Sequence, residues 1–317
     1  MKKISFSLIL TVIMAVGIFL PASAKKSRHS QASFTVASYN LRNANRSDSV
    51  NGNGWGQRMP YICDIVRFHG FDIFGTQECF RHQLDSLVSR LPGYAYIGIG
   101  RDDGKRAGEH SAIFYDKNQF DVLDSGNFWL SETPDRPGLG WDAVCTRICT
   151  WGKFRHRASG REFIFANLHM DHVGRKARVE GAKLVRRKLA EIAPDCPAIV
   201  TGDFNVDQND PVYGTMTSDG DFRDSYEIAG FRYAPTGTFN NFRPDGFTTS
   251  RIDHVFLTPQ FVVEKYGILT DTYRAPDPKS PSAGMKTHDA PSELEMERYI
   301  ARTPSDHFPV AVHLTLK

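Results

Sequence analysis

The chain consists of short runs of β-forming residues that alternate with helical segments, and this alternation restricts the folds open to it. Runs rich in Val, Ile, Phe, Tyr and Thr are typical of strands. They predict strands at 34–40, 72–77, 94–99, 111–116, 120–130, 144–157, 162–168, 197–202, 252–258, 261–269 and 308–315. Eleven strands exceed the comfortable size of one open sheet, so we expect an α/β fold in which two sheets pack together.

Apolar residues at helical spacing predict three helices, at 57–68, 80–90 and 174–192. The outer face of the third helix is basic and carries Arg175, Lys176, Arg178, Lys183, Arg186, Arg187 and Lys188. A solvated helix surface is the commoner meaning of such a run, and a nucleic-acid face is the alternative. The stretch 271–302 is dense in Pro, Asp, Ser and Gly, which predicts a long loop with a short helix at 292–299.

The N-terminus has the features of a secretory signal peptide. Lys2 and Lys3 precede an apolar run, and small residues around Ala24 form a cleavage site. We therefore expect a signal peptide at 1–24, export to the periplasm or the medium, and no stable membrane insertion of the mature chain. Residues 25–32 are expected to form a polar tether, and 33–317 one domain with a loop insertion at 271–302.

The charge balance gives little support to tight duplex binding. The chain has 39 basic and 36 acidic residues, and loss of 1–24 removes Lys2 and Lys3 but no acid. The mature protein is therefore nearly neutral, whereas duplex-binding proteins usually present a strongly basic surface. Nucleic acid stays an alternative partner, because a local basic patch need not change the totals. The sequence does not specify the oligomeric state.

Polar side chains follow several of the predicted strands, and the clearest case is the end of the strand at 197–202. Asp203 and Asn205 are two residues apart, so in an extended chain they project to the same side. A carboxylate there can orient a water molecule while the amide binds a phosphate oxygen. Taken alone, an ordinary turn after a strand is the simpler explanation of this pair.

Two further segments pair a carboxylate with a histidine. Asp306 and His307 lie just before the last predicted strand, where positions between loop and strand favour function over packing. Asp253 alternates onto the same apolar face as Val255 and Leu257, and an acid on such a face needs a partner. We expect His307 to be that partner, because an Asp–His pair orients the imidazole and favours its cationic form beside a phosphate.

Asn40 and Glu78 each end an apolar run with a side chain that offers oxygen. Mg²⁺ prefers oxygen ligands and keeps several waters, which matches an Asn, a Glu and an Asp that converge from different strand ends. His169 follows another apolar run in the same way. Because His169 and His172 lack the helical spacing of a zinc motif, a dedicated zinc site is not expected.

Taken in order, these segments resemble the motifs of the endonuclease/exonuclease/phosphatase superfamily, also called DNase I-like. The resemblance spans about residues 33–317 and rests on SYNLR, TQE, SAIFY, NLHMDH, GDFN, SRIDHVF and SDHFPV. It implies a four-layer α/β sandwich, with two mixed sheets face to face, helices outside and the site at one end of the sheets. Trp55-Gly-Gln-Arg58 and the segment that begins at Glu109 are similar to the branch of deadenylase-type and exported bacterial members.

The resemblance also implies roles for the residues singled out above. Glu78 would be the principal Mg²⁺ ligand, with Mn²⁺ as the alternative ion and with Asn40 and Asp306 nearby. Either Asp203 or His307 would act as the base, Asn205 would hold phosphate, and Asp253 would brace His307. His169 would stabilise the charged transition state, braced by Glu109. The expected substrate-contacting set is Asn205, His169, Arg58 and Glu109.

The sequence thus predicts an exported Mg²⁺-dependent phosphoesterase that hydrolyses a phosphodiester or a phosphomonoester with an activated water. A nuclease that acts on DNA or RNA is one alternative. An inactive exported binding module is another, but such a module should have lost site residues, and all eight of the catalytic and metal-site residues above are present. The 271–302 insertion directly precedes Asp306, so we expect it to overhang the site and to favour small or single-stranded substrates over a duplex.

Overall fold

The computed structural model describes residues 31–317 except 278, 280–283, 286–290 and 292. One seven-stranded mixed sheet contains β1 (Ala32–Asn40), β2 (Ile73–Gln77), β3 (Tyr94–Ile97), β4 (Ile113–Asp116), β10 (Phe231–Tyr233), β12 (Phe261–Ile268) and β15 (Val310–Leu316). Its strand order is β10-β12-β15-β1-β2-β4-β3, which places the two ends of the domain side by side as the antiparallel pair β1 and β15.

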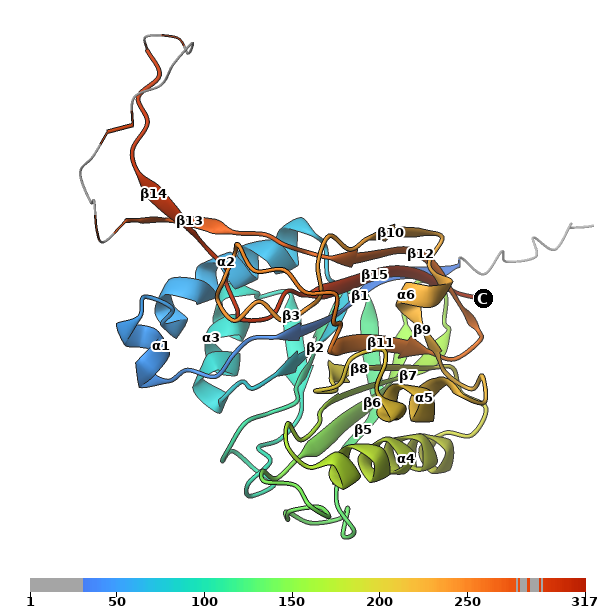
Figure 1. Ribbon diagram of the computed structural model, residues 1–317. Coiled ribbons are helices and arrows are strands. Elements are labelled where there is room, and N and C mark those ends of the chain that lie inside the picture. The colour runs from blue at the N-terminus through green and yellow to red at the C-terminus, as the bar shows by residue number, and fades with distance from the viewer. Residues whose placement is uncertain (1–30, 278, 280–283, 286–290, 292) are drawn as a thin grey trace, which may run out of the picture.

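A second sheet of six strands packs against the first (Figure 1). It contains β5 (Phe120–Trp129), β6 (Ile148–His156), β7 (Glu162–His169), β8 (Ala198–Asp203), β9 (Arg223–Asp224) and β11 (Asp253–Leu257), in the order β5-β6-β7-β8-β11-β9. The helices are α1 (Arg46–Val50), α2 (Trp55–Phe68), α3 (Arg81–Arg90), α4 (Arg175–Ile192), α5 (Pro211–Thr217) and α6 (Ser225–Ile228).

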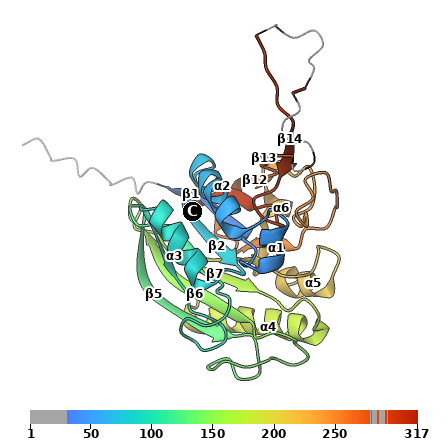
Figure 2. The same cartoon turned by 90° about the vertical axis from the view of Figure 1, so that its left-hand side faces the viewer.

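Three apolar cores hold these elements in four layers. α2 and α3 lie on the outer face of the first sheet, and α4 and α5 lie on the outer face of the second (Figure 2). Strand β1 contributes apolar side chains to two of these cores. Phe34 and Val36 face the core between the sheets, whereas Ala37 and Tyr39 face the core under α2 and α3. The predicted four-layer α/β sandwich is confirmed.

All eleven predicted strands and all three predicted long helices are present, with ends that shift by a few residues. The largest shift is at β6, which begins at Ile148 rather than 144. Ala32 is fully buried and pairs with Leu316, so this residue belongs to the sheet rather than to the predicted tether. Residues 1–30, and with them the predicted signal peptide, lie outside the described residues.

The elements that the sequence did not predict are short or polar. They are α1, α5, α6, β9, β10 and a ribbon made of β13 (Tyr273–Pro276) and β14 (Tyr299–Arg302). The short helix predicted at 292–299 is wrong for the residues described there, since Glu297 makes a β-bridge to Gly284 and Tyr299 begins β14. Within the described part of the chain, no helix is long and apolar enough to cross a membrane.

Candidate active site

The sheet topology brings the predicted catalytic side chains to one edge. β7 and β8 run parallel, and their last residues, His169 and Asp203, are directly opposite each other. β11 runs antiparallel to β8, so its first residue, Asp253, is also opposite Asp203. Residues opposite each other in neighbouring strands point to the same face. In the other sheet, β1 and β2 run parallel. Asn40 is the last residue of β1, and Glu78 directly follows β2.

Backbone strain collects at this edge. Arg42, Glu78 and Asn205 each follow a strand end and have left-handed backbones, with φ of 56°, 67° and 51°. Left-handed backbone conformations cost free energy for any residue other than glycine, and they persist where the surrounding contacts fix them. Asn205 illustrates this, because its backbone N–H donates to Asp203 Oδ1 at 2.9 Å and its Nδ2 donates to the Met170 carbonyl at 2.9 Å.

His307 and Asp253 form the predicted pair. His307 Nδ1 lies 2.8 Å from Asp253 Oδ2, and both side chains are buried. Burial lowers the pKa of His307, but the neighbouring carboxylates, Asp253 above all, outweigh it and raise this pKa to about 10. His307 is therefore a cation at neutral pH, and its Nε2 lies 3.8 Å from Asp203 Oδ2. The ring edge of Phe239 packs against the imidazole at a centroid distance of 5.0 Å.

Asp203 lies between His307, His169 and Asn40, and its surroundings disfavour its ionised form. Burial, followed by the charge of Asp253, raises its pKa to about 7, although His307 and two hydrogen bonds oppose the rise. One of these bonds comes from Asn40 Nδ2, which donates to Asp203 Oδ2 at 3.0 Å. A carboxylate with a pKa near 7 is suited to accept a proton from water near neutral pH.

His169 is a neutral side chain at the same edge. Burial, together with the positive charges of Arg147 and Arg101, lowers the pKa of His169 well below its ordinary value. Asn205 Nδ2 lies 3.1 Å from His169 Nε2, so these two predicted phosphate contacts are adjacent. Among the described residues, His169 Nδ1 has no hydrogen-bond partner. The predicted brace from Glu109 is therefore absent, and Glu109 instead pairs with Arg101 and accepts a hydrogen bond from Asn43.

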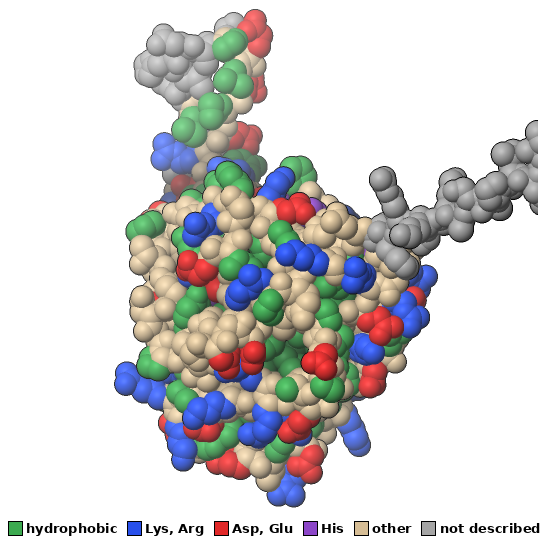
Figure 3. Space-filling view, turned by 90° about the vertical axis from the view of Figure 1, so that its right-hand side faces the viewer, with side chains coloured by type: hydrophobic (Ala, Val, Ile, Leu, Met, Phe, Trp, Pro, Cys, Tyr) green, Lys and Arg blue, Asp and Glu red, His purple; other side chains and the backbone are tan. Residues whose placement is uncertain are grey.

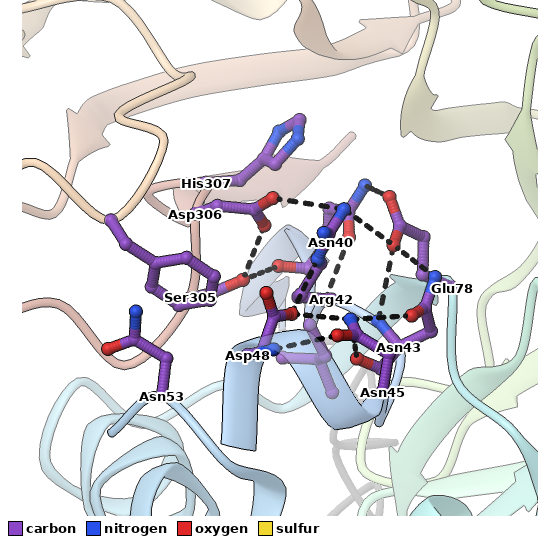
Figure 4. A network of polar contacts seen from close by, with 12 residues as sticks. Asn40, Arg42, Asn43, Asn45, Asp48, Asn53, Glu78, Ser305, Asp306 and His307 are labelled. Atoms are coloured by element: carbon purple, nitrogen blue, oxygen red, sulfur yellow. Dashed lines mark hydrogen bonds and ion pairs between the residues drawn. The ribbon is translucent and has the colours of Figure 1, made fainter. Parts of the chain in front are cut away.

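The residues predicted for metal binding converge from three segments (Figure 4). Half-buried Glu78 accepts hydrogen bonds from Asn40 Nδ2 at 3.1 Å and from Asn43 Nδ2 at 3.0 Å. Ser305 Oγ donates to the Asn40 carbonyl at 2.7 Å and so ties the segment that carries Asp306 to the end of β1. Burial raises the pKa of Asp306, and the charge of Glu78 raises it further. Converging hard oxygen donors that disfavour each other's charge fit a divalent cation.

Asn40 takes part in this group in an unexpected way. Its Nδ2 donates to both Glu78 and Asp203, while its Oδ1 accepts a hydrogen bond from the Arg42 backbone N–H at 3.0 Å. In this arrangement Asn40 orients two carboxylates and turns its oxygen away from them. A direct bond from Asn40 to the metal stays a prediction.

Two clusters of metal-ligating side chains are found among the described residues. In one, ligand atoms of Asp203, Asp253 and His307 lie within 4.8 Å of one another, and this cluster belongs to the catalytic group. The other contains Cys145, Asp171 and His172. There the carboxylate of Asp171 accepts hydrogen bonds from the backbone N–H groups of Val144, Cys145, Val173 and Gly174. We therefore interpret the second cluster as a structural anchor of the loop before α4.

Arg58, predicted to contact substrate, does not line the pocket in this structure. It is fully buried and donates to four backbone carbonyls, those of Leu41, Arg42, Asn53 and Pro304, at 2.7 to 3.2 Å. The helix pattern of the sequence cannot distinguish such an inward arginine from a solvated one. Arg58 instead connects the segment after β1 to the segment before Asp306, and so positions both sides of the proposed metal site.

These side chains line a pocket of about 440 Å³. It contains all of the predicted catalytic residues except Asp253, which lies behind His307, together with Glu78, Asp306 and Glu109. The lining residues that were not among the predicted site residues are Arg42, Asn43, Arg101, Cys145, Arg147, His172, Phe239, Asn241 and Ile252. Arg42 was within reach, since it lies two residues after Asn40 in SYNLR. Asn43, His172 and Ile252 also lie in or beside the quoted motifs, whereas Arg101, Cys145, Arg147, Phe239 and Asn241 reach the pocket from segments that no motif marks.

The described residues of the insertion at 271–302 do not overhang the pocket, contrary to the prediction. Its ribbon of β13 and β14 extends away from the sheets (Figure 1), and none of its described residues lines the pocket. The base of the ribbon is held by a stacked pair of rings, Tyr61 and Tyr273, with centroids 4.0 Å apart. Arg302 donates to the Asn53 side chain at 2.8 Å. The insertion therefore gives no support to a preference for small substrates.

Comparison with known proteins places this arrangement in a family. A sequence model of the Endonuclease/Exonuclease/phosphatase family matches residues 37–307. The crystal structure of a family protein from Bacteroides thetaiotaomicron is 57% identical, with a TM-score of 0.84, and the match covers 90% of this chain and 99% of that one. The mannosyl-6-phosphatase of Bacteroides thetaiotaomicron VPI-5482 is also 57% identical, with a TM-score of 0.82 and coverage of 89% and 99%.

Curated relatives match over part of their length. An uncharacterized protein of Acanthamoeba polyphaga mimivirus is 27% identical over 160 residues, and the match covers 48% of this chain and 60% of that protein. The family match and the structural neighbours confirm the DNase I-like fold and the resemblance inferred from the motifs. The chain belongs to the Endonuclease/Exonuclease/phosphatase family, whose members are metal-dependent hydrolases of phosphate esters.

Proposed function

We propose that this protein is an exported, Mg²⁺-dependent phosphatase that removes the phosphate group from a small sugar phosphate. The observation that carries the proposal is the pocket. Its volume of about 440 Å³ is in the range of small-molecule sites, and the catalytic group forms its polar wall. A monosaccharide phosphate fits such a volume, whereas a duplex needs an extended surface.

Similarity to a relative of known activity supports the sugar substrate. The mannosyl-6-phosphatase is 57% identical to this chain over nearly its whole length. Phe239 adds a local feature, because it lines the pocket beside His307 and leaves 42% of its surface exposed. An exposed aromatic ring next to the phosphate position offers an apolar face on which a sugar ring can pack.

The chemistry follows from the positions of the side chains. Glu78 and Asp306 would hold the divalent ion, which neutralises charge on the phosphate and on the leaving oxygen when bound. Asp203 accepts a proton from the attacking water, since its pKa lies near neutrality. Cationic His307 and the Asn205 amide face the phosphate oxygens, and neutral His169 lies beside Asn205. Asp253 keeps His307 charged and oriented.

The surface gives little support to the nuclease alternative. Several basic residues of α4 are paired with acids, as Lys183 is with Glu180, Lys188 with Glu191, and Arg186 with Asp219 and Asp221. No residue of α4 lines the catalytic pocket. On the face shown in Figure 3, Lys and Arg side chains are interspersed with Asp and Glu and form no continuous basic surface. A phosphate backbone would find few unpaired cations along this helix.

Export is supported by the signal-peptide features of residues 1–24. Expression of the whole chain in a bacterial host should yield a secreted or periplasmic protein whose sequenced N-terminus is Lys25. Recovery of the uncut chain from the cytoplasm would contradict export without bearing on the catalytic proposal.

A substrate panel tests the proposed activity. With Mg²⁺, mature protein should release phosphate from mannose 6-phosphate or a related sugar phosphate with a kcat/KM at least about a hundredfold above that for bis(p-nitrophenyl) phosphate, RNA or DNA, because the pocket admits a compact monoester. If DNA or RNA were the best substrate, with a rate that falls steeply between low and moderate salt, a nuclease assignment would replace this one.

Chelation should abolish this activity. After exhaustive treatment with EDTA and gel filtration, turnover should fall by at least about a thousandfold, because the ion supplies several kcal/mol of transition-state stabilisation. Mg²⁺ or Mn²⁺ should restore turnover, since the ligands are hard oxygens. Full activity in the chelated protein, or restoration by Zn²⁺ alone, is incompatible with the proposed site.

A further inference from the structure

The geometry points to Arg42 as the second cation of this active site. Its guanidinium lies beside both proposed metal carboxylates, Glu78 and Asp306, so the site would take one divalent ion and the arginine would bind the substrate phosphate. This inference rests on the proposed function and concerns the same pocket. Three features of Arg42 carry it, namely a fixed backbone, an anchored side chain and two nearby carboxylates.

The backbone of Arg42 is held from several sides. Its N–H donates to Asn40 Oδ1 at 3.0 Å, and its carbonyl accepts hydrogen bonds from Gln83 Nε2 at 3.0 Å and from Arg58 Nη2 at 3.2 Å. These contacts maintain a left-handed conformation with φ of 56°. A strained backbone fixed by three partners is typical of a residue whose side chain must point in one direction. Here that direction is into the pocket.

The side chain is anchored by a dedicated acid. Arg42 Nε donates to Asp48 Oδ2 at 2.9 Å, and the same oxygen accepts a hydrogen bond from Asn45 Nδ2. Asn45 also caps α1 by accepting a hydrogen bond from the Asp48 N–H at 2.8 Å. Asp48, in the first turn of α1, therefore holds the guanidinium in place, and Figure 4 shows Arg42, Asn45 and Asp48 in this contact. Anchorage through Nε leaves the terminal nitrogens for other partners.

One terminal nitrogen reaches both proposed metal carboxylates. Arg42 Nη1 lies 3.5 Å from Asp306 Oδ2 and 3.9 Å from Glu78 Oε2. These distances mark an ion-pair contact that is looser than a hydrogen bond, so the carboxylates keep oxygens for one metal ion. A second ion between the same groups would have to displace a guanidinium that Asp48 holds in place. About a third of the Arg42 side chain stays exposed (34%) at the pocket wall, where a phosphate can reach it.

Two opposite effects follow from this position. The charge of Arg42 repels a metal ion bound to the same carboxylates, so it weakens metal binding. The same charge attracts phosphate, and a guanidinium is well shaped to donate two hydrogen bonds to it. An arginine that served only to hold the loop in place would produce neither effect. Removal of Arg42 should therefore tighten metal binding and weaken phosphate binding.

Calorimetric titration of the mature protein, with no organic substrate present, tests the inference. The wild type should bind one Mn²⁺ per chain, and Arg42→Met should bind Mn²⁺ about tenfold more tightly because a repelling charge is gone. Inorganic phosphate, titrated into the metal-loaded proteins, should bind Arg42→Met about tenfold more weakly than the wild type. Arg42→Lys should fall between them, since it keeps the charge but loses the planar donor pair.

Arg46→Met is the matched control, because Arg46 is an exposed arginine on α1 that does not line the pocket. It should leave both affinities unchanged. Two Mn²⁺ ions per wild-type chain, or an Arg42→Met variant that binds Mn²⁺ no more tightly than the wild type, would overturn the inference. Because neither titration uses an ester, failure of the sugar-phosphate panel would count against the proposed function alone.

Discussion

Replacement of Asp203 by asparagine should lower kcat by about a thousandfold or more and should leave the metal-free protein folded. The rate falls because an amide cannot accept the proton of the attacking water, and a positioned base contributes roughly 10² to 10⁴ in rate. The position of Asp203 adds to this loss, since its carboxylate lies 3.8 Å from cationic His307 and binds Asn40 Nδ2. Initial rates on the best sugar phosphate at saturating Mg²⁺ give the effect on kcat.

Measurement of stability distinguishes a loss of kcat from a loss of folded protein. The pKa of Asp203 is raised to about 7, so the folded protein binds a proton more tightly than the unfolded chain, whose Asp titrates near 3.8. This group therefore makes the metal-free protein lose stability as pH rises from about 4 to 7, and the loss persists above pH 7. Asp203→Asn has no such charge. At pH 8 in EDTA its urea midpoint should match or exceed that of the wild type, despite the altered contact with Asn40.

Asp195→Asn provides the control for the chemical change, because Asp195 is exposed and lies outside the catalytic pocket. It should retain wild-type kcat and a wild-type urea midpoint. A kcat for Asp203→Asn within tenfold of wild type would show that another group takes the proton, and His307 would then be the remaining candidate among the predicted bases.

The sequence predicts the central strands well because β2, β7, β8 and β11 are buried on both faces over almost their whole length. In β1, residues facing the sheet core and residues facing α2 and α3 are both apolar, which makes the run easy to recognise. β10 could not be found in this way, since Phe231, Arg232 and Tyr233 are all exposed and the strand exists only through its pairing with β12. α1 has no buried residue and is defined by its Asn45 cap.

Residues at strand ends were predictable for a physical reason. A strand that runs through the core is mainly apolar, so an ionisable residue at its end marks the edge of the sheet. His169 and Asp203 end β7 and β8, and Asp253 begins β11, which runs antiparallel to β8. The three side chains therefore meet at one edge of the sheet. The partner of Asp253 could also be predicted, because an acid on an apolar face needs a cation.

Residues that depend on side-chain direction could not be predicted. Arg58 and Glu109 were expected to touch substrate, but Arg58 turns inward to four carbonyls. Glu109 lines the pocket with its charge committed to Arg101. Arg147 enters the pocket from the start of β6, and only the packed structure shows that its charge helps to keep His169 neutral. Such contacts join segments far apart in the chain, and no local pattern records them.

Replacement of Asp253 by asparagine is the second change with a large expected effect, although Asp253 lies behind His307 and does not line the pocket. Loss of its charge should lower the pKa of His307 from about 10, because burial then acts against the cation with less opposition. At pH 8 a larger share of His307 should be neutral in the variant than in the wild type. We expect kcat to fall by about a thousandfold, since an Asp-to-Asn change behind a catalytic histidine in a serine protease triad costs on the order of 10⁴.

The pH dependence should identify the cause. His307 has a folded pKa above its unfolded value near 6.5, so the pair contributes its full stability below pH 6.5 and loses it as pH rises through about 10. Asp253→Asn should therefore lower the free energy of unfolding by roughly 3 kcal/mol at pH 6, as expected when a buried pair loses one partner, and by less at pH 10. The fall of kcat/KM at alkaline pH should move from near pH 10 toward neutrality.

Asp85→Asn is a suitable control, because it breaks an exposed ion pair with Arg81 and should change stability by less than about 0.5 kcal/mol. The Asp253→Asn variant could lose stability while its kcat/KM still falls near pH 10. That result would mean that Asp253 stabilises the fold and that Asp203 and Asp306 keep His307 charged. If kcat/KM instead falls at a lower pH than in the wild type, this buried carboxylate sets the protonation state of His307 through their contact of 2.8 Å.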